Sequence, residues 1–238
     1  METTTDKLLG GRIQLRQPAE GYRVAVDPVL LAAAVRADKY QRVAELGCGT
    51  GAALLCLNAR VMGLSGIGLE PDATLRNLAE ANMDANAAPF GIIEGDVETA
   101  LTFDPQEYDH VFFNPPFYDD ADFSASPHET RNKAHALTVP LAGWFKAARR
   151  MLKPEGELTL IIPPAMLQET LGLMNGMGAI EVLPIRAASA KPAKRLIVRG
   201  IMGRKTPLAV LPDFILHKED GSYTDGAEAV LRGGKALP

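Results

Sequence analysis

The chain has 238 residues, 47% of them hydrophobic and 23% charged, which is typical of a soluble globular protein with one domain. Its first residues, METTTDKLLGG, lack the apolar core of a signal peptide, and no run approaches the roughly 18 apolar residues that cross a membrane. The two cysteines, Cys48 and Cys56, form no disulfide framework, so we expect a reduced, cytoplasmic protein.

The net charge of −4 argues against a nucleic-acid partner, but the charges are unevenly distributed along the chain. Residues 183–212 contain no acidic residue in an otherwise acidic protein. Their basic residues are Arg186, Lys191, Lys194, Arg195, Arg199, Arg204 and Lys205. The sequence therefore predicts one basic patch, for which phosphate binding is the commonest use and an ordinary solvated turn the alternative.

Apolar runs of strand length alternate with segments of helical period. The predicted strands are 42–46, 66–70, 91–96, 108–114, 157–163, 180–187 and 195–203. The predicted helices are 52–62, a helix after Pro71 capped by Asp72, 141–152 and 165–177. This order predicts an α/β fold with a mainly parallel, twisted sheet and helices on both faces. The last two strands are separated by only seven residues, too few for a parallel crossover, so we expect them to form a terminal antiparallel hairpin.

The segment AELGCGTGAALL (44–55) places three glycines between a predicted strand and a predicted helix. Glycines there permit a tight turn and close approach of a ligand to the backbone at a helix N-terminus. Such a loop could hold a dinucleotide or S-adenosylmethionine, or be a plain turn. Glu70 ends the next strand about 20 residues later, where a carboxylate can accept both hydroxyls of a ribose.

The spacing of this loop differs from the dinucleotide pattern G-x-G-x-x-G, because it reads G-C-G-T-G after Glu45. It resembles the first motif of Rossmann-like, class I methyltransferases, and Asp96 matches the acidic residue that these enzymes direct at the adenine amino group. The resemblance implies S-adenosylmethionine as cofactor and S-adenosylhomocysteine as product. The implied cofactor-binding residues are Tyr22, Asp27, Glu45, Gly47, Cys48, Gly49, Thr50, Gly51, Glu70, Pro71, Asp96, Val97 and Asn114.

The strand at 108–114 runs directly into Asn114-Pro115-Pro116-Phe117, where the prolines end ladder pairing. An exocyclic amino group is a poor nucleophile because its lone pair is delocalised. Two acceptors, the side-chain oxygen of Asn114 and the carbonyl of Pro115, could hold both N–H bonds and direct the lone pair toward a methyl donor. Phe117 offers a face on which an extruded base can stack. The sequence therefore predicts catalytic roles for these four residues, and no metal, since no Cys/His spacing suggests one.

The NPPF segment resembles the [DNS]-PP-[YFW] motif of amino-group methyltransferases. Most of the chain also resembles the bacterial methyltransferases that make N6-methyladenine beside the anticodon of valine tRNA, through YRVAVDPVLLAA (22–33), KPAKRLIV (191–198) and DFILHKEDGSYTDGAEAVLRG (213–233). The resemblance implies a tRNA substrate, with RNA contacts at Arg131, Lys133, Lys191, Lys194 and Arg195. We expect one methyltransferase domain over 1–238, with an extension over the cofactor site (1–40), a core (41–205) and a tail (206–238).

The long segment 118–139 has little periodicity and is predicted to be a lid over the target nucleotide. It departs from the family in reading ETRNKAHALT after the NPPF motif, so its contacts cannot be transferred residue by residue. The enzyme alternative is a glutamine-N5 methyltransferase acting on a release factor, whose family has Asn-Pro-Pro-Tyr here. Remoter alternatives are an NAD-binding Rossmann protein and a non-catalytic RNA-binding module. Both a monomer and a homodimer remain open.

Overall fold

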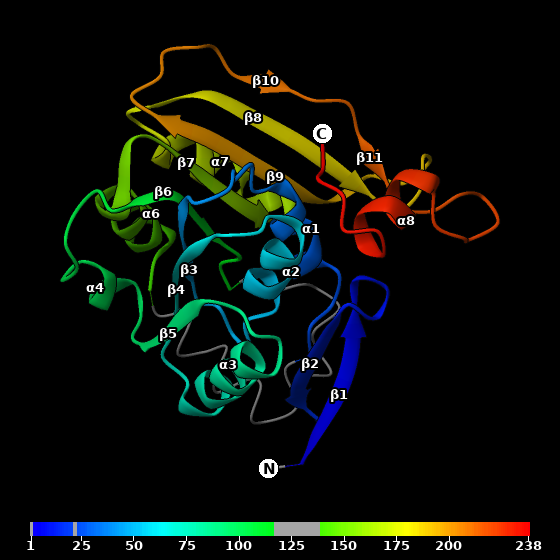
Figure 1. Cartoon of the computed structure of the whole chain (residues 1–238). Helices are drawn as coiled ribbons and strands as arrows, with labels where there is room; N and C mark the ends of the chain where they lie inside the picture. Colours follow the sequence, from blue (N-terminus) through cyan, green and yellow to red (C-terminus); the bar gives the residue numbers. More distant parts are fainter. Residues whose placement is uncertain (1, 21–22, 117–138) are drawn as a thin grey trace.

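The computed structural model describes residues 2–20, 23–116 and 139–238, and most of these residues surround one mixed sheet (Figure 1). In this part of the chain the sheet has nine strands, in the order β10-β8-β9-β7-β6-β3-β4-β5, with β11 also paired to β8. The strands are β1 (Thr3–Leu8), β2 (Ile13–Pro18), β3 (Arg42–Leu46), β4 (Ser65–Glu70), β5 (Phe90–Glu94), β6 (Tyr108–Phe113), β7 (Leu152–Ile162), β8 (Met177–Arg186), β9 (Ala193–Met202), β10 (Ala209–Val210) and β11 (Phe214–Ile215). The helices are α1 (Asp27–Ala34), α2 (Ala52–Arg60), α3 (Ala73–Ala85), α4 (Val97–Ala100), α6 (Leu141–Met151), α7 (Leu167–Leu173) and α8 (Asp225–Leu231), with 3₁₀ turns η1 (Leu9–Gly11) and η3 (Pro164–Met166).

The predicted α/β architecture is confirmed. Strands β3, β4, β5, β6 and β7 pair in parallel, and β9 runs antiparallel to both β7 and β8. The predicted hairpin is therefore present as β8–β9. The short strands β10 and β11, which the sequence did not predict, lie parallel to the outer edge of β8.

Two apolar clusters fill the two faces of the sheet, because successive strand residues point to opposite sides. On β6, Phe112 belongs to the cluster beneath α1, α2 and α8, whereas Val111 and Phe113 belong to the cluster beneath α6. Trp144 on α6 is 7% exposed and packs against Phe113 with ring centroids 5.4 Å apart, so its indole ring is part of this cluster. Helices thus cover both faces, and Figure 1 shows α1 and α2 side by side on one of them.

An N-terminal hairpin of β1 and β2 forms a separate two-stranded sheet that the sequence analysis did not predict. Strand β2 lies beside α3 (Figure 1).

Helix α3 begins after Asp72, as predicted, since the Asp72 side chain accepts hydrogen bonds from the backbone N–H groups of Thr74 and Leu75. Within the described residues, no helix has the length and apolar character needed to cross a membrane.

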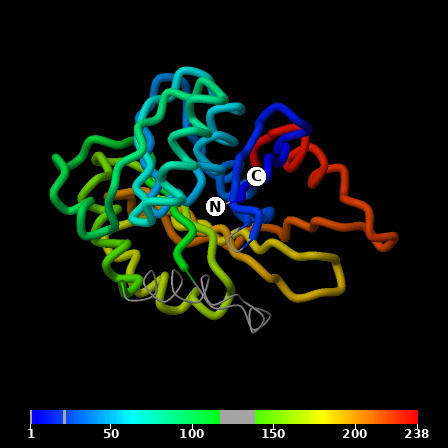
Figure 2. Tube along the Cα trace, turned by 90° about the horizontal axis from the view of Figure 1, so that it is seen from below, coloured from blue at the N-terminus to red at the C-terminus, as the bar shows by residue number. Residues whose placement is uncertain are grey.

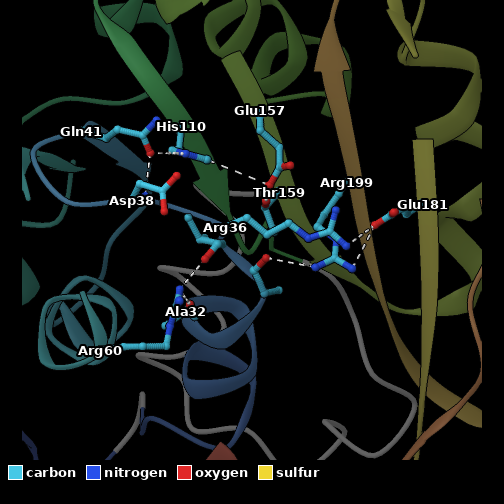
Figure 3. A network of polar contacts seen from close by, with 12 residues as sticks. Ala32, Arg36, Asp38, Gln41, Arg60, His110, Glu157, Thr159, Glu181 and Arg199 are labelled. Atoms are coloured by element: carbon cyan, nitrogen blue, oxygen red, sulfur yellow. Dashed lines mark hydrogen bonds and ion pairs between the residues drawn. The ribbon is translucent and has the colours of Figure 1, made fainter. Parts of the chain in front are cut away.

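A buried polar network links β6, β7, β8 and β9 with the end of α1 (Figure 3). His110 on β6 lies with Nε2 2.9 Å from the side-chain oxygen of Gln41 and Nδ1 4.0 Å from a carboxylate oxygen of Glu157. Arg199, only 1% exposed, lies 3.0 Å from the carboxylate of Glu181. Burial lowers the pKa of His110 to about 4 and raises the pKa of Glu157.

Candidate active site

The carboxyl ends of the parallel strands bring the predicted site residues to one edge of the sheet. Phe113, the last residue of β6, pairs with Leu160 of β7, and Ile162 at the end of β7 pairs with Leu196 near the start of β9. The turn between β8 and β9 therefore lies at the edge where Asn114 follows β6. Figure 2 shows this hairpin extending from the body of the molecule. Ligands bind at this edge in open α/β sheets.

The glycine loop has the conformation that its sequence predicts. Gly47, Gly49 and Gly51 have φ values of 66°, 57° and 80°, a region that residues with a side chain rarely adopt. A Cβ atom at Gly47 would lie 2.9 Å from Cη2 of Trp144, so the loop rests directly on that indole ring. The loop is tied to β4 by a hydrogen bond from the N–H of Cys48 to the carbonyl of Leu69, at 2.8 Å.

Glu70 faces this loop from the end of β4. Its Oε2 accepts the N–H of Gly49 at 2.8 Å, and its Oε1 accepts the N–H of Asp72 at 3.0 Å. Burial raises the pKa of the Glu70 carboxyl, and these two hydrogen bonds act in the opposite direction. The structure thus joins a carboxylate to the glycine loop across 21 residues of sequence.

Glu45 is buried on the preceding strand beside this arrangement. Its Oε2 has no hydrogen-bond partner among the described residues. Burial raises its pKa well above the usual value, and the nearby charge of Glu70 acts in the same direction. A buried carboxylate oxygen without a partner is unusual, and a polar ligand would satisfy it. Cys48 of the loop is also buried, and burial raises the pKa of its thiol.

Asp96 follows β5 and caps the short helix α4. Its Oδ1 accepts the N–H groups of Glu98 and Thr99 at 2.9 and 3.0 Å. Val97, predicted to contact the cofactor, is a buried member of the apolar cluster beneath α6. Pro71, predicted likewise, is exposed directly after Glu70.

Asn114 and Pro115 follow β6 at the same edge of the sheet. Asn114 is half-buried, and its Oδ1 is a buried atom for which the described chain provides no hydrogen-bond partner. The preceding Phe113 is fixed by ring contacts with Trp144 and Phe145, at centroid distances of 5.4 and 5.9 Å. A rigid aromatic base therefore supports the Asn114 amide at this edge of the sheet. Phe117 lies outside the described residues, as do Tyr22, Arg131, Lys133 and nearly all of the predicted lid.

Asp27, predicted to bind the cofactor, pairs with Arg195, predicted to bind RNA. Arg195 Nε lies 2.8 Å from Asp27 Oδ2, and both side chains are mostly buried. The pair joins the first turn of α1 to β9 across 168 residues of sequence.

The basic patch is smaller than the sequence predicted, because acidic residues from distant segments pair with much of it. The recorded pairs are Arg186 with Asp213, Arg195 with Asp27, Arg199 with Glu181 and Arg204 with Glu155. No ion pair recorded between described residues involves Lys191, Lys194 or Lys205, all of which are exposed. Only Lys191 and Lys194 of these three lie near the β8–β9 turn, since Lys205 follows the far end of β9.

Asn82, which the sequence did not single out as a site residue, also contacts the glycine loop. Asn82 is 1% exposed on α3 and donates a hydrogen bond of 2.9 Å to the carbonyl of Thr50 in the glycine loop. The available signal was its position, because a polar residue stands where the helical period of Leu75, Leu78 and Ala79 requires a buried one.

These residues fit a ligand that carries hydroxyl and amino groups and approaches the backbone closely. The observations that favour such a ligand are the left-handed glycines of the loop and the buried oxygens of Glu45 and Asn114, for which the described part of the chain offers no hydrogen-bond partner. S-adenosylmethionine has this donor set. Across the described ranges, no group of three or more His, Cys, Asp or Glu side chains could hold a metal ion.

Curated relatives of this chain are named tRNA1(Val) (adenine(37)-N6)-methyltransferase. The protein of that name from Aeromonas hydrophila is 26% identical over 85% of this chain and 86% of its own length. The one from Parabacteroides distasonis is 29% identical over 74% of this chain and 75% of its own length. The predicted resemblance to this group is confirmed.

Solved structures and a family model agree on the fold. A predicted O-methyltransferase from Agrobacterium tumefaciens has a TM-score of 0.73 at 23% identity, covering 89% of this chain and 98% of its own. A putative class I S-adenosylmethionine-dependent methyltransferase from Listeria monocytogenes has a TM-score of 0.53 at 19% identity, covering 77% and 62%. The methyltransferase small domain model matches residues 25–187. The chain therefore belongs to the methyltransferase small domain family and has the class I fold of S-adenosylmethionine-dependent methyltransferases.

Proposed function

We propose that the protein methylates N6 of an adenine in tRNA, and that the target lies beside the anticodon of valine tRNA. The observation that carries the proposal is the buried Oδ1 of Asn114, which has no hydrogen-bond partner among the described residues and directly follows β6 in an Asn-Pro-Pro-Phe segment. An amide oxygen in that position suits an amino group that must be oriented rather than deprotonated. The names of the curated relatives support tRNA adenine as the bearer of that group.

The cofactor would lie along the carboxyl ends of β3, β4 and β5. The glycine loop would allow its close approach, and Glu70 would accept hydrogen bonds from the ribose hydroxyls at a strand end suited to that role. Asp96 would accept a hydrogen bond from the amino group of the cofactor's adenine. Glu45, whose Oε2 lacks a partner within the described chain, would accept a hydrogen bond from a polar group in the methionine portion of the cofactor.

When bound, S-adenosylmethionine would supply an electrophilic methyl group for transfer from sulfur to the target nitrogen, with S-adenosylhomocysteine as the other product. Asn114 Oδ1 and the Pro115 carbonyl would each accept a hydrogen bond from one N–H of the amino group on the target adenine. Holding both N–H bonds turns the nitrogen lone pair toward the methyl group, and the surplus proton leaves to water afterwards. No strong base is needed, because the methyl group of a sulfonium is already highly electrophilic and the positively charged nitrogen that results releases its proton readily. Phe117 would stack on the extruded base.

The tRNA backbone would lie across the β8–β9 turn, at the same edge of the sheet as Asn114. Lys191 and Lys194 are the exposed cations there, and lysines contribute to RNA affinity by neutralising phosphates. Such an enzyme would act in the cytoplasm. The paired Arg195 would contribute less to RNA affinity than the two lysines, because Asp27 already neutralises it.

The test is methyl transfer to unmodified valine tRNA by the purified protein, followed by mass spectrometry of the nucleosides. We expect N6-methyladenosine beside the anticodon, and its absence from a matched transcript with guanosine at that position. A parallel reaction supplies a release-factor fragment containing its conserved glutamine. Methylation of the glutamine, without methylation of the tRNA, would replace this proposal with the glutamine-N5 activity.

A further inference from the structure

Asn82 of α3 and Asn86, the residue that caps the C-terminus of this helix, hold the outer edge of β2 through their side-chain amides. Asn82 accepts the N–H of Arg16 at 2.8 Å and donates to the Arg16 carbonyl at 2.9 Å. Asn86 accepts the N–H of Gln14 at 3.1 Å and donates to the Gln14 carbonyl at 2.8 Å. Four residues of helix span about 6 Å and two residues of strand about 7 Å, so the two spacings match. The helix thereby takes the place of a neighbouring strand for the hairpin.

The two asparagines differ in their remaining hydrogen bond. Asn82 Nδ2 also donates to the carbonyl of Thr50 at 2.9 Å, and both residues are fully buried. Asn86 Nδ2 donates instead to the carbonyl of Asn82, in the last turn of α3, at 2.8 Å. Only Asn82 therefore contacts both the N-terminal hairpin and the glycine loop.

Thr50 lies between Gly49 and Gly51, which both have left-handed backbone conformations. The position of its carbonyl fixes the peptide that joins Thr50 to Gly51, whose N–H in turn donates to the Cys48 carbonyl at 2.9 Å. Without Asn82, the Thr50 carbonyl would be left in a buried site lacking this partner, a situation that native structures avoid. The amide of Asn82 thus helps to set the geometry of the loop.

We propose that Asn82 is a positioning residue that couples cofactor binding at the glycine loop to the docking of the β1–β2 hairpin. The inference rests on the proposed cofactor site at this loop. A ligand that fixes the loop also fixes the Thr50 carbonyl, and therefore the amide that holds Arg16. Because such coupling is reciprocal, the docked hairpin in turn favours the loop conformation that binds the cofactor.

The first test uses the wild-type protein and amide hydrogen exchange with and without S-adenosylhomocysteine. The N–H of Arg16 donates directly to Asn82, so its exchange rate reports this contact. We expect S-adenosylhomocysteine to slow exchange throughout β2, including at Arg16. Unchanged exchange in β2, with bound ligand demonstrated by calorimetry in the same sample, would overturn the inference.

The second test compares Asn82→Ala with the matched control Asn86→Ala. Both variants lose one pair of contacts to β2, but only Asn82→Ala loses the contact to Thr50. We expect Asn82→Ala to bind S-adenosylhomocysteine about tenfold more weakly than the wild type, and the ligand no longer to slow amide exchange in β2 of this variant. In Asn86→Ala we expect both the wild-type affinity and the slowing of exchange in β2. Equal effects of the two substitutions would reduce Asn82 to a hairpin contact and refute the coupling. A wild-type protein that binds no S-adenosylhomocysteine would instead refute the proposed cofactor site.

Discussion

Replacing His110 with glutamine tests the buried network of Figure 3 through the pH dependence of stability. Burial lowers the pKa of His110 from 6.5 to about 4. As the pH falls, His110 therefore takes up its proton near pH 6.5 in the unfolded chain but only near pH 4 in the folded protein. A depressed pKa of this kind contributes stability that is present above pH 6.5 and is lost as the pH falls toward 4.

The size of this loss follows from the two pKa values. A shift of this size corresponds to about 3 kcal/mol when the pH is below both values, of which about 2 kcal/mol is lost by pH 5. Glu157 acts in the opposite direction, because burial raises its pKa and the folded protein therefore takes up its proton first. Replacing His110 with glutamine removes the histidine contribution, and with it the lowering of the Asp109 pKa by a charged His110, whereas the Glu157 carboxyl remains.

The assay is urea unfolding at pH 7.5 and at pH 5, with the free energy of unfolding extrapolated to water. Between these pH values, we expect the wild type to lose about 2 kcal/mol more than His110→Gln, with equal dependence on urea concentration. Parallel losses in the two proteins would show that His110 takes up its proton as readily in the folded protein as in the unfolded chain. The reasoning from burial would then be wrong.

Three further predictions concern the proposed function. Asn114→Ala should lower the single-turnover rate of methyl transfer, measured by rapid quench, by about 10²–10³, and a wild-type rate would contradict the mechanism. Cofactor affinity should change little in this variant, because Glu70, Asp96 and the glycine loop remain. Glu70→Ala should weaken S-adenosylhomocysteine binding by about tenfold to a hundredfold in calorimetry, and unchanged affinity would remove Glu70 from the site. Changing Lys191 and Lys194 together to alanine should reduce the slope of log RNA affinity against log salt by about two, whereas Lys205→Ala at the far end of β9 should leave it unchanged.

Sequence reasoning succeeded where a signal was local. The capping position of Asp72, the glycines of the loop and the abrupt stop at Pro115 each depend on residues a few positions away. The seven-residue link between β8 and β9 was likewise sufficient to predict an antiparallel pair, because parallel strands need a longer crossover. These features follow from backbone geometry alone.

Sequence reasoning was less successful where the interaction partner of a residue comes from a distant segment of the chain. Arg195 looked available for RNA because the residues around it are basic, yet its partner Asp27 is 168 residues away. The hairpin of β1 and β2 gave only a weak signal, because the alternating pattern of β2 has just two buried apolar positions, Ile13 and Leu15. The side-chain amides of Asn82 and Asn86, which also hold β2, come from a distant segment of the chain. Counting charges along a chain cannot show which of them meet in the folded protein.

The packing of Trp144 between two parts of the proposed site gives the protein an intrinsic optical probe. The chain has one tryptophan, and its indole contacts the position of Gly47 in the glycine loop as well as the ring of Phe113 directly before Asn114. Emission excited at the red edge of indole absorption therefore comes from a single buried ring. Changes in its wavelength or intensity would follow the loop and the end of β6 together, without a label or an added chromophore.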